Sequence, residues 1–255
     1  MAEVILEVKN VVKTFDDFMA LKGVSIKLRK GEFSALIGPN GAGKTTLYNV
    51  ISGKFPPTSG EVVFDGRLVH GLPPHQLLRL GISRSFQLTN VFAGLTVREN
   101  FLAALVACHD RGKDLWNPLK RCKDLYEEAE HILEQLGLTH VTELPVKALS
   151  YGDKRLVEVG LALASRPKLV MLDEPTAGMN PEETDRMIHL LKKLSREMDT
   201  TFFLTEHDMK VVFSVADRIF VLHQGELLAE GSPAEIRENR KVKEAYLGER
   251  SVAGA

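Results

Sequence analysis

The sequence predicts an α/β fold of three parts: a core of buried parallel strands, an antiparallel β subdomain and an α-helical subdomain. Three observations lead to this prediction. Strand-like alternation fills the first part of the chain, where one apolar run, residues 32–37, enters a glycine-rich loop. Helical patterns then fill the middle. Apolar strands that alternate with helix-start signals return near residue 165, which is the order typical of a parallel sheet.

The first part is expected to mix antiparallel strands with one buried parallel strand. A helix should follow the glycine-rich loop from Lys44 to about Ser52, with Gly53 ending it. The dipeptide Asp65-Gly66 suits a tight turn between two strands, so residues 60–69 predict a hairpin. The strands expected here are residues 4–8, 24–28, 32–37, 60–64, 67–69 and 82–86.

The middle of the chain is expected to be helical. A capping box at Thr96–Glu99 begins an apolar helix that runs through Ala107. A second helix is expected over residues 123–136. The third begins at Ser150, an N-cap residue, with Asp153 placed to return its hydrogen bond.

The last part returns to parallel α/β. Asn180, followed by a proline and two acids, begins a long helix, and Ser232 caps a last one. The expected strands are residues 169–172, 201–205, 218–222 and 226–229. We expect a single domain over residues 1–255: α/β core with β subdomain in 1–92 and 165–232, helical subdomain in 93–164, and a C-terminal helical tail in 233–255.

Composition sets broad limits on function. With 44% hydrophobic residues, 26% charged residues and a net charge of −1, the chain lacks the overall basic charge that favours nucleic-acid binding. Cys108 and Cys122 fit neither a zinc spacing nor a secreted disulfide pattern, so a reducing, cytosolic compartment is expected. The longest apolar stretch, residues 101–108, is too short to span a bilayer. Work at a membrane would need other chains to span it.

The glycine-rich loop is the main chemical signal. It matches the phosphate-loop pattern G-x-x-x-x-G-K-[ST], in which backbone N–H groups and a helix N-terminus hold phosphate oxygens. Lys44 is expected to reach the β- and γ-phosphates of a nucleotide, and the Thr45 hydroxyl to ligate Mg²⁺. The alternative, a plain glycine-rich turn, is disfavoured by the strand-loop-helix context. The loop residues are Gly38, Pro39, Asn40, Gly41, Ala42, Gly43, Lys44, Thr45 and Thr46.

Four further side chains are candidates for the same site. Asp173 ends a buried strand, where its carboxylate can hold Mg²⁺ through water, and Glu174 beside it can polarise the attacking water as general base. His207 follows strand 201–205 and is a candidate γ-phosphate contact that also orients the base; the alternative is a surface histidine. Gln87 is a candidate contact to Mg²⁺ or water, or only a loop glutamine.

Ser150 and Gly152 begin a helix, so they form a second candidate anion site. This segment lies far along the chain from the phosphate loop and cannot easily fold back onto it. It can close over the nucleotide of a second copy. The alternative is an ordinary N-cap.

Together these motifs resemble the ATP-binding subunits of ATP-binding-cassette (ABC) transporters, over nearly the whole chain. The shared order is an aromatic residue, the phosphate loop, a glutamine, the Ser-x-Gly helix start, an Asp-Glu strand end and a histidine. The resemblance implies a phosphate-loop (RecA-like) core and an ATPase with ATP and Mg²⁺ as cofactors. It also implies a homodimer, or a heterodimer with a sister ATPase subunit, in which Ser150 and Gly152 of one subunit hold the ATP of the other. Phe15 would stack on adenine, with Phe18 the less suitable choice.

Two motifs depart from the usual family pattern, and both departures point to one branch of that family. Tyr151 and Asp153 stand where the family usually has glycine and glutamine, and Asn180 stands where it usually has aspartate. These departures, with residues 206–210 and 245–249, resemble importers of branched-chain amino acids and related small amides. The resemblance implies a peripheral position on the cytoplasmic face of the membrane, integral-membrane permease subunits and, indirectly, a solute-binding protein.

The alternatives to this interpretation differ in the molecule that the ATPase acts on or works with. One is the ABC ATPase of a lipid or lipopolysaccharide transporter, which shares much of the architecture. Another is a soluble ABC ATPase that acts on nucleic acid or ribosomes, although such proteins usually carry two cassettes or a long coiled coil. We expect permease subunits to dock near Gln87 and the apolar residues 91–95. Those apolar residues would otherwise belong to the core.

Overall fold

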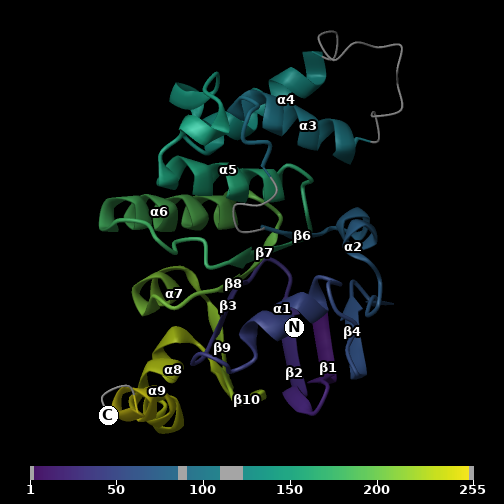
Figure 1. Ribbon diagram of the computed structural model, residues 1–255, viewed down its shortest axis with the longest axis vertical. Coiled ribbons are helices and arrows are strands. Elements are labelled where there is room, and N and C mark those ends of the chain that lie inside the picture. The colour runs from purple at the N-terminus through teal and green to yellow at the C-terminus, as the bar shows by residue number, and fades with distance from the viewer. Residues whose placement is uncertain (1–2, 86–90, 110–122, 253–255) are drawn as a thin grey trace.

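The computed structural model describes residues 3–85, 91–109 and 123–252. Its larger sheet has six strands in the order β10-β9-β3-β8-β7-β6 (Figure 1). Neighbouring strands are parallel except β10, which is antiparallel to β9. These strands are β3 (Phe33–Ile37), β6 (Ile82–Arg84), β7 (Leu169–Asp173), β8 (Thr201–Thr205), β9 (Arg218–His223) and β10 (Glu226–Gly231).

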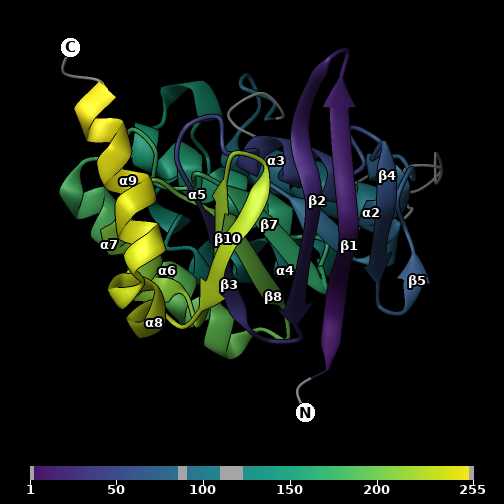
Figure 2. The same ribbon diagram turned by 90° about the horizontal axis from the view of Figure 1, so that it is seen from below.

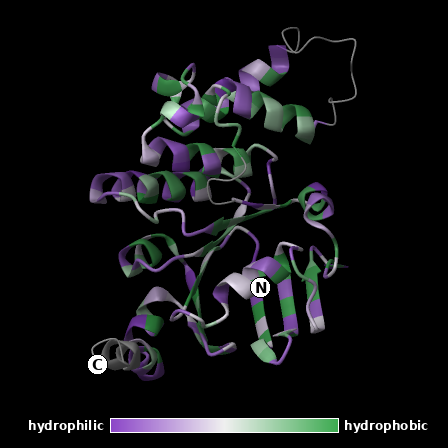
Figure 3. Cartoon of the chain, in the orientation of Figure 1, coloured by the Kyte–Doolittle hydropathy of each residue, from purple (hydrophilic) through white to green (hydrophobic). Residues whose placement is uncertain are grey.

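The smaller sheet is antiparallel, in the order β2-β1-β4-β5. The predicted hairpin is confirmed: Asp65 and Gly66 both have positive φ, at 49° and 72°, as the tight turn requires. Two strands are much longer than predicted, because register shifts between β1 and β2 interrupt the alternation. Figure 3 shows polar and apolar bands along them. Their bounds are β1 (Val4–Phe15), β2 (Phe18–Arg29), β4 (Ser59–Phe64) and β5 (Arg67–Leu68).

The six-stranded sheet carries a hydrophobic core on each face. Along β3, Phe33, Ala35 and Ile37 enter one core, whereas Leu36 enters the other, as alternating strand side chains must. The second core also holds Leu47 of α1 and residues of the smaller sheet, so α1 packs between the two sheets. The helices of this α/β portion are α1 (Lys44–Ile51), α2 (Pro74–Leu80), α6 (Pro181–Glu197) and α7 (Met209–Val215).

Three helices form what we call the helical part: α3 (Val97–Cys108), α4 (Lys123–Gln135) and α5 (Tyr151–Leu163). The predicted capping box is present, with Thr96 and Glu99 exchanging both hydrogen bonds. Gly160 lets α5 pack closely, because a Cβ there would lie 2.2 Å from a methyl of Leu136 and 2.7 Å from the Phe101 ring. Figure 1 shows α5 beside α6, and the start of α5 contacts α6, where Gly152 lies against Glu183.

The C-terminal segment differs from the single last helix that was predicted. It forms α8 (Pro233–Glu238), capped by Ser232, and then α9 (Arg240–Val252). Seen from below in Figure 2, these two helices flank the side of the molecule away from β4 and β5. Two short helices, α2 and α7, were not predicted at all. In the described residues, no helix combines the length and the apolar character needed to cross a membrane.

Candidate functional site

The glycine-rich loop joins β3 to α1 and is packed against the backbone of two strands, β9 and β2. Gly38 has φ 153°, and a Cβ there would lie 2.2 Å from the carbonyl oxygen of Leu222 in β9. Gly43, the N-cap of α1, has φ 101°, and a Cβ there would lie 2.9 Å from the carbonyl oxygen of Ala20 in β2. Only glycine fits these two positions. The packing holds the loop's backbone N–H groups at the N-terminus of α1, where they can bind phosphate.

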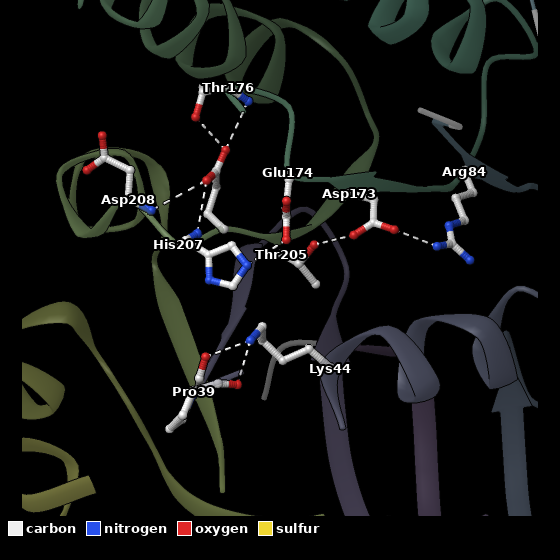
Figure 4. Close-up of polar contacts among 11 residues, drawn as sticks. Pro39, Lys44, Arg84, Asp173, Glu174, Thr176, Thr205, His207 and Asp208 are labelled. Carbon is white, nitrogen blue, oxygen red and sulfur yellow. Dashed lines mark hydrogen bonds and ion pairs between the residues drawn. The ribbon is translucent and has the colours of Figure 1, made fainter. Parts of the chain in front are cut away.

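Lys44 is buried at the first position of α1. Its ammonium donates hydrogen bonds to loop carbonyl oxygens, at 2.6 Å to Gly38 and 2.9 Å to Pro39 (Figure 4). A buried ammonium that bridges its own loop is placed to neutralise phosphate charge at the same spot.

Asp173 lies across from the loop, at the carboxyl end of β7. Thr205, its partner at the end of β8, donates its hydroxyl to Asp173 Oδ1 at 2.6 Å. The carboxyl ends of parallel strands are where such folds place ligands. Asp173 and the Thr45 hydroxyl are oxygen donors of the kind that Mg²⁺ prefers, and Mg²⁺ commonly uses one carboxylate together with nucleotide phosphates. This donor set fits the expected ion, and no cluster of three His, Cys, Asp or Glu side chains in the described residues offers another metal site.

Arg84 is a member of the site that the sequence did not reveal. One guanidinium nitrogen lies 2.5 Å from Asp173 Oδ2, and the other donates to Asn49 Oδ1 at 2.7 Å and to the Ser52 hydroxyl at 2.9 Å. The ion pair is nearly buried, with side-chain exposures of 10% and 14%. Arg84 ends β6, the neighbour of β7. Only the strand order brings it to Asp173, and strand order was not readable from the sequence.

Burial and the nearby Asp173 charge both raise the pKa of the Tyr48 hydroxyl well above its ordinary value, so this group stays protonated beneath the site.

Glu174 and His207 meet at the same edge of the sheet. His207 Nε2 lies 2.7 Å from Glu174 Oε1 (Figure 4). Glu174 has φ 49°, a left-handed conformation that is rare for a residue with a side chain and that clusters at functional sites. The pair therefore matches the expected arrangement of a carboxylate base with a histidine that orients it.

Glu206 is a second residue that the sequence did not single out. It is buried, and one carboxylate oxygen accepts hydrogen bonds from the backbone and hydroxyl of Thr176, at 2.9 and 2.5 Å. The other oxygen accepts from the backbone N–H of His207 at 3.0 Å. Glu206 thus joins the segment after Glu174 to the segment that carries His207.

Ser150 and Gly152 lie at the start of α5, as predicted. The Ser150 hydroxyl accepts from the Asp153 backbone N–H at 3.1 Å. Asp153 does not return a bond to the Ser150 backbone; its carboxylate accepts the Ser150 hydroxyl at 2.7 Å instead. The predicted reciprocal box is therefore only half formed. Gly152 lies against Glu183 of α6, where a Cβ would come within 2.6 Å of a carboxylate oxygen.

Phe15 ends β1 and is 38% exposed. Phe55 meets the ring edge to face at 5.5 Å between centroids, and Lys13 Nζ lies 5.0 Å from the Phe15 centroid. A ring steadied in this way and still partly open can stack on a base. Phe18, across the hairpin, is 66% exposed.

A groove runs between α2, β6, α3 and α5. Its cavity measures about 340 Å³, and its walls include Leu78, Ile82, Val91, Ala104, Glu158 and Leu161. Gln87 falls outside the described residues. Phe92 and Leu95 are exposed at 62% and 38%, so these two side chains do not belong to the core. The amide of Asn100, itself buried, accepts from the Phe92 N–H at 2.8 Å and donates to the Phe92 and Thr96 carbonyls at 3.1 and 2.9 Å.

Comparison with known families gives two matches. Residues 21–177 match the ABC transporter family. Residues 226–251 match the family of branched-chain amino acid ATP-binding cassette transporters.

Individual proteins match over almost the whole chain. The chain is 40% identical to the high-affinity branched-chain amino acid transport ATP-binding protein BraF of Pseudomonas aeruginosa, over 98% of this chain and 100% of that protein. A crystal structure of the ADP conformation of an ATP-binding cassette of an ABC transporter superposes with a TM-score of 0.85 at 34% identity, over 96% of this chain and 99% of the other. A dimeric cassette in a post-hydrolysis state, bound to ADP and Pi, superposes with a TM-score of 0.76 at 28% identity, over 90% and 99%.

Proposed function

This chain belongs to the ABC transporter family of ATP-binding cassettes, and from that membership we propose that it energises an importer of branched-chain amino acids or related small amides. Like the rest of the family it is a nucleotide-binding ATPase. The observation that carries the choice of solute is the near full-length similarity to BraF, together with the C-terminal match to the branched-chain amino acid family. That match favours amino-acid import over a lipid or lipopolysaccharide transporter.

The proposed roles of the site residues follow the family pattern, and the geometry of the described residues supports several of them. The loop from Gly38 to Thr46 holds the phosphates of ATP, with Lys44 neutralising their charge. Thr45 and Asp173, with Gln87 from outside the described residues, hold Mg²⁺, which when bound supplies positive charge to the phosphates.

Hydrolysis falls to Glu174 and His207 in this proposal. Glu174 accepts the proton of the attacking water, and His207 holds the Glu174 carboxylate in place at 2.7 Å while contacting the γ-phosphate. Phe15 stacks on the adenine ring, because its partly open face is steadied by Phe55.

Ser150 and Gly152 are proposed to hold the ATP of a second subunit, either an identical copy or a sister ATPase. They begin α5, whose N-terminus carries the positive end of the helix dipole and can therefore hold phosphate. The dimeric cassette among the similar structures supports this arrangement.

The groove between α2, β6, α3 and α5 is the proposed docking place for permease subunits, because it is apolar and is bordered by the exposed Phe92 and Leu95. Docking there places the chain at the cytoplasmic face of the membrane, with a solute-binding protein as an indirect partner. In this proposal ATP joins two subunits and hydrolysis releases them, and the opening and closing pass to the permease subunits through the groove. The proposed division of the chain is an α/β core in residues 1–92 and 165–232, a helical subdomain in residues 93–164 and a tail in residues 233–255.

Glu174→Gln tests this proposal. The change keeps the shape of the side chain and removes the base, so kcat should fall by a hundredfold or more, as expected for loss of general base catalysis, while ATP binding persists. Because ATP then stays intact, the variant should accumulate as an ATP-bound dimer in size-exclusion chromatography. Assembly of the wild-type chain with its permease in vesicles, followed by amino-acid-dependent ATPase, tests the solute. Normal turnover by Glu174→Gln would remove Glu174 from its role.

A further inference from the structure

Tyr151 makes contacts that neither the phosphate loop nor the second-subunit site requires. It is the first residue of α5, and its hydroxyl donates a hydrogen bond to the carbonyl oxygen of Ala177 at 2.8 Å. Ala177 belongs to the same chain and lies three residues after Glu174. Gly178 packs against the ring, since a Cβ there would lie 3.1 Å from the Tyr151 hydroxyl. Through this side chain, the helical part contacts residues 177–178 of the same chain, just after the proposed base Glu174.

Ala177 is held at both of its backbone groups. Its carbonyl accepts from Tyr151, and its N–H donates to the carbonyl oxygen of Glu174 at 3.1 Å. The second bond closes the turn in which Glu174 takes its φ of 49°. Such a conformation persists only where the surroundings fix it. Tyr151 thus lies two hydrogen bonds from the backbone of the proposed base.

On its other side Tyr151 is held by a buried ion pair. Arg155, one helical turn along α5, donates to the Tyr151 hydroxyl at 2.9 Å and to a Glu158 carboxylate oxygen at 2.8 Å. The Arg155 and Glu158 side chains are each 6% exposed. Burial opposes the charge of Arg155, but the bonds to Glu158 and Tyr151 outweigh it and raise the pKa of Arg155. Glu158 also lines the groove described above.

We propose that Tyr151 is a positioning residue for hydrolysis in its own subunit, because it ties the turn that carries Glu174 to Arg155 and Glu158 at the wall of the groove. The Tyr151 hydroxyl accepts a hydrogen bond from Arg155 and donates one to the Ala177 carbonyl. It therefore connects Arg155 directly to the turn that carries Glu174. A shift of α5 relative to α6 would alter the turn of the base without touching the phosphate loop. That hydrolysis depends on Glu174 and that a permease occupies the groove rest on the proposed function.

The first test is Tyr151→Phe in the full chain, which keeps the ring and removes both hydrogen bonds. We expect kcat for ATP to fall about two- to tenfold, the range that one ordinary hydrogen bond supports, with KM for ATP unchanged. Hydrogen exchange of peptides covering residues 174–179 should become faster. The control is Tyr126→Phe on α4, whose hydroxyl bonds to none of the described residues and which should match the wild type. A wild-type kcat, or a lower kcat with unchanged exchange of residues 174–179, would overturn the proposal.

The second test is a double-mutant cycle with Glu158→Gln. If Glu158 acts through Arg155 and Tyr151, Glu158→Gln should lower kcat with KM unchanged, and the double variant should be no slower than Tyr151→Phe alone. Losses that simply multiply would overturn the link to the groove. Both tests use the chain without its permease. Their outcomes are therefore independent of those that test the proposed function. The proposed function is contradicted if Glu174→Gln hydrolyses ATP at the normal rate, or if permease and amino acid leave the ATPase rate unchanged.

Discussion

The helix starts of α1 and α5 are both built from small residues, and they are embedded in opposite ways. The start of α1 is enclosed by backbone: Gly38 and Gly43 lie against carbonyl oxygens of β9 and β2. The start of α5 is bordered by side chains, with Gly152 against Glu183 and the Ser150 hydroxyl turned to Asp153. Backbone cannot yield, whereas side chains can turn. The first start is therefore a fixed cradle, and the second is a surface that can meet different neighbours.

Gly38→Ala should break the fixed cradle most severely. The new Cβ meets the Leu222 carbonyl at 2.2 Å in a conformation that disfavours side chains, so we expect loss of ATP binding and a destabilisation of about 3 kcal/mol or more. The matched control is Gly41→Ala, at φ 76° with no atom within 4 Å of the new Cβ, which should cost about 1 kcal/mol. Urea unfolding and fluorescent-nucleotide titration measure both. Equal effects of the two changes would show that the close approach to β9 is unimportant.

His207→Ala should act mainly on chemistry, because His207 contacts Glu174, its proposed γ-phosphate contact is only one of several that hold ATP, and its side chain is about half exposed. We expect kcat to fall about ten- to a hundredfold, with ATP affinity nearly unchanged and the free energy of unfolding within about 0.5 kcal/mol of wild type. Steady-state ATPase kinetics measure the first two quantities. A large rise in KM with an intact kcat would instead make His207 a binding residue.

Ser150→Ala should distinguish the roles of the two helix starts in ATP binding. Made in the Glu174→Gln background, it should leave ATP binding by the single chain intact, since the phosphate loop is untouched, and weaken the ATP-dependent dimer about tenfold. Loss of the N-cap should also cost about 1 kcal/mol of stability. Analytical ultracentrifugation with ATP measures the dimer. Weaker nucleotide binding by the monomer would place Ser150 in the chain's own site.

Gly152→Ala should be the mildest change. A new Cβ meets the Glu183 side chain, whose carboxylate also accepts the Asn180 N–H at 3.0 Å. Turning that side chain away costs about one hydrogen bond, roughly 1 kcal/mol, and alanine favours the helix over glycine by about 1 kcal/mol. The two terms nearly cancel, so the thermal midpoint should stay close to that of the wild type, in contrast to Gly38→Ala. A large fall in the midpoint would show that the start of α5 is as rigidly enclosed as that of α1.

Local signals predicted much of this fold. The caps at Thr96 and Asn180 and the Asp65-Gly66 turn lie where expected, because each depends on neighbours within a few residues. The strand ends carrying Asp173 and His207 were found in the same way. The α2 and α7 helices were missed, since each has only seven residues and too little periodicity to detect.

Contacts between distant residues were out of reach. Arg84 meets Asp173 only because β6 pairs with β7. Tyr151 was noticed as a departure from the family pattern, yet its bond to Ala177 depends on how α5 lies over the catalytic segment. The domain limits and most residue roles stay predictions for the same reason, because they depend on how distant parts of the chain, ligands and other subunits act on one another.

The amide of Asn100 fixes the turn that displays Phe92, because it accepts from the Phe92 N–H and donates to the Phe92 carbonyl. A large aromatic side chain is thus held in solvent by a buried anchor rather than by its own packing. A partner that covers this ring meets a backbone already in its final shape, so little conformational entropy is lost on contact. Recognition at this edge of the groove should therefore lose little affinity to the ordering of the turn.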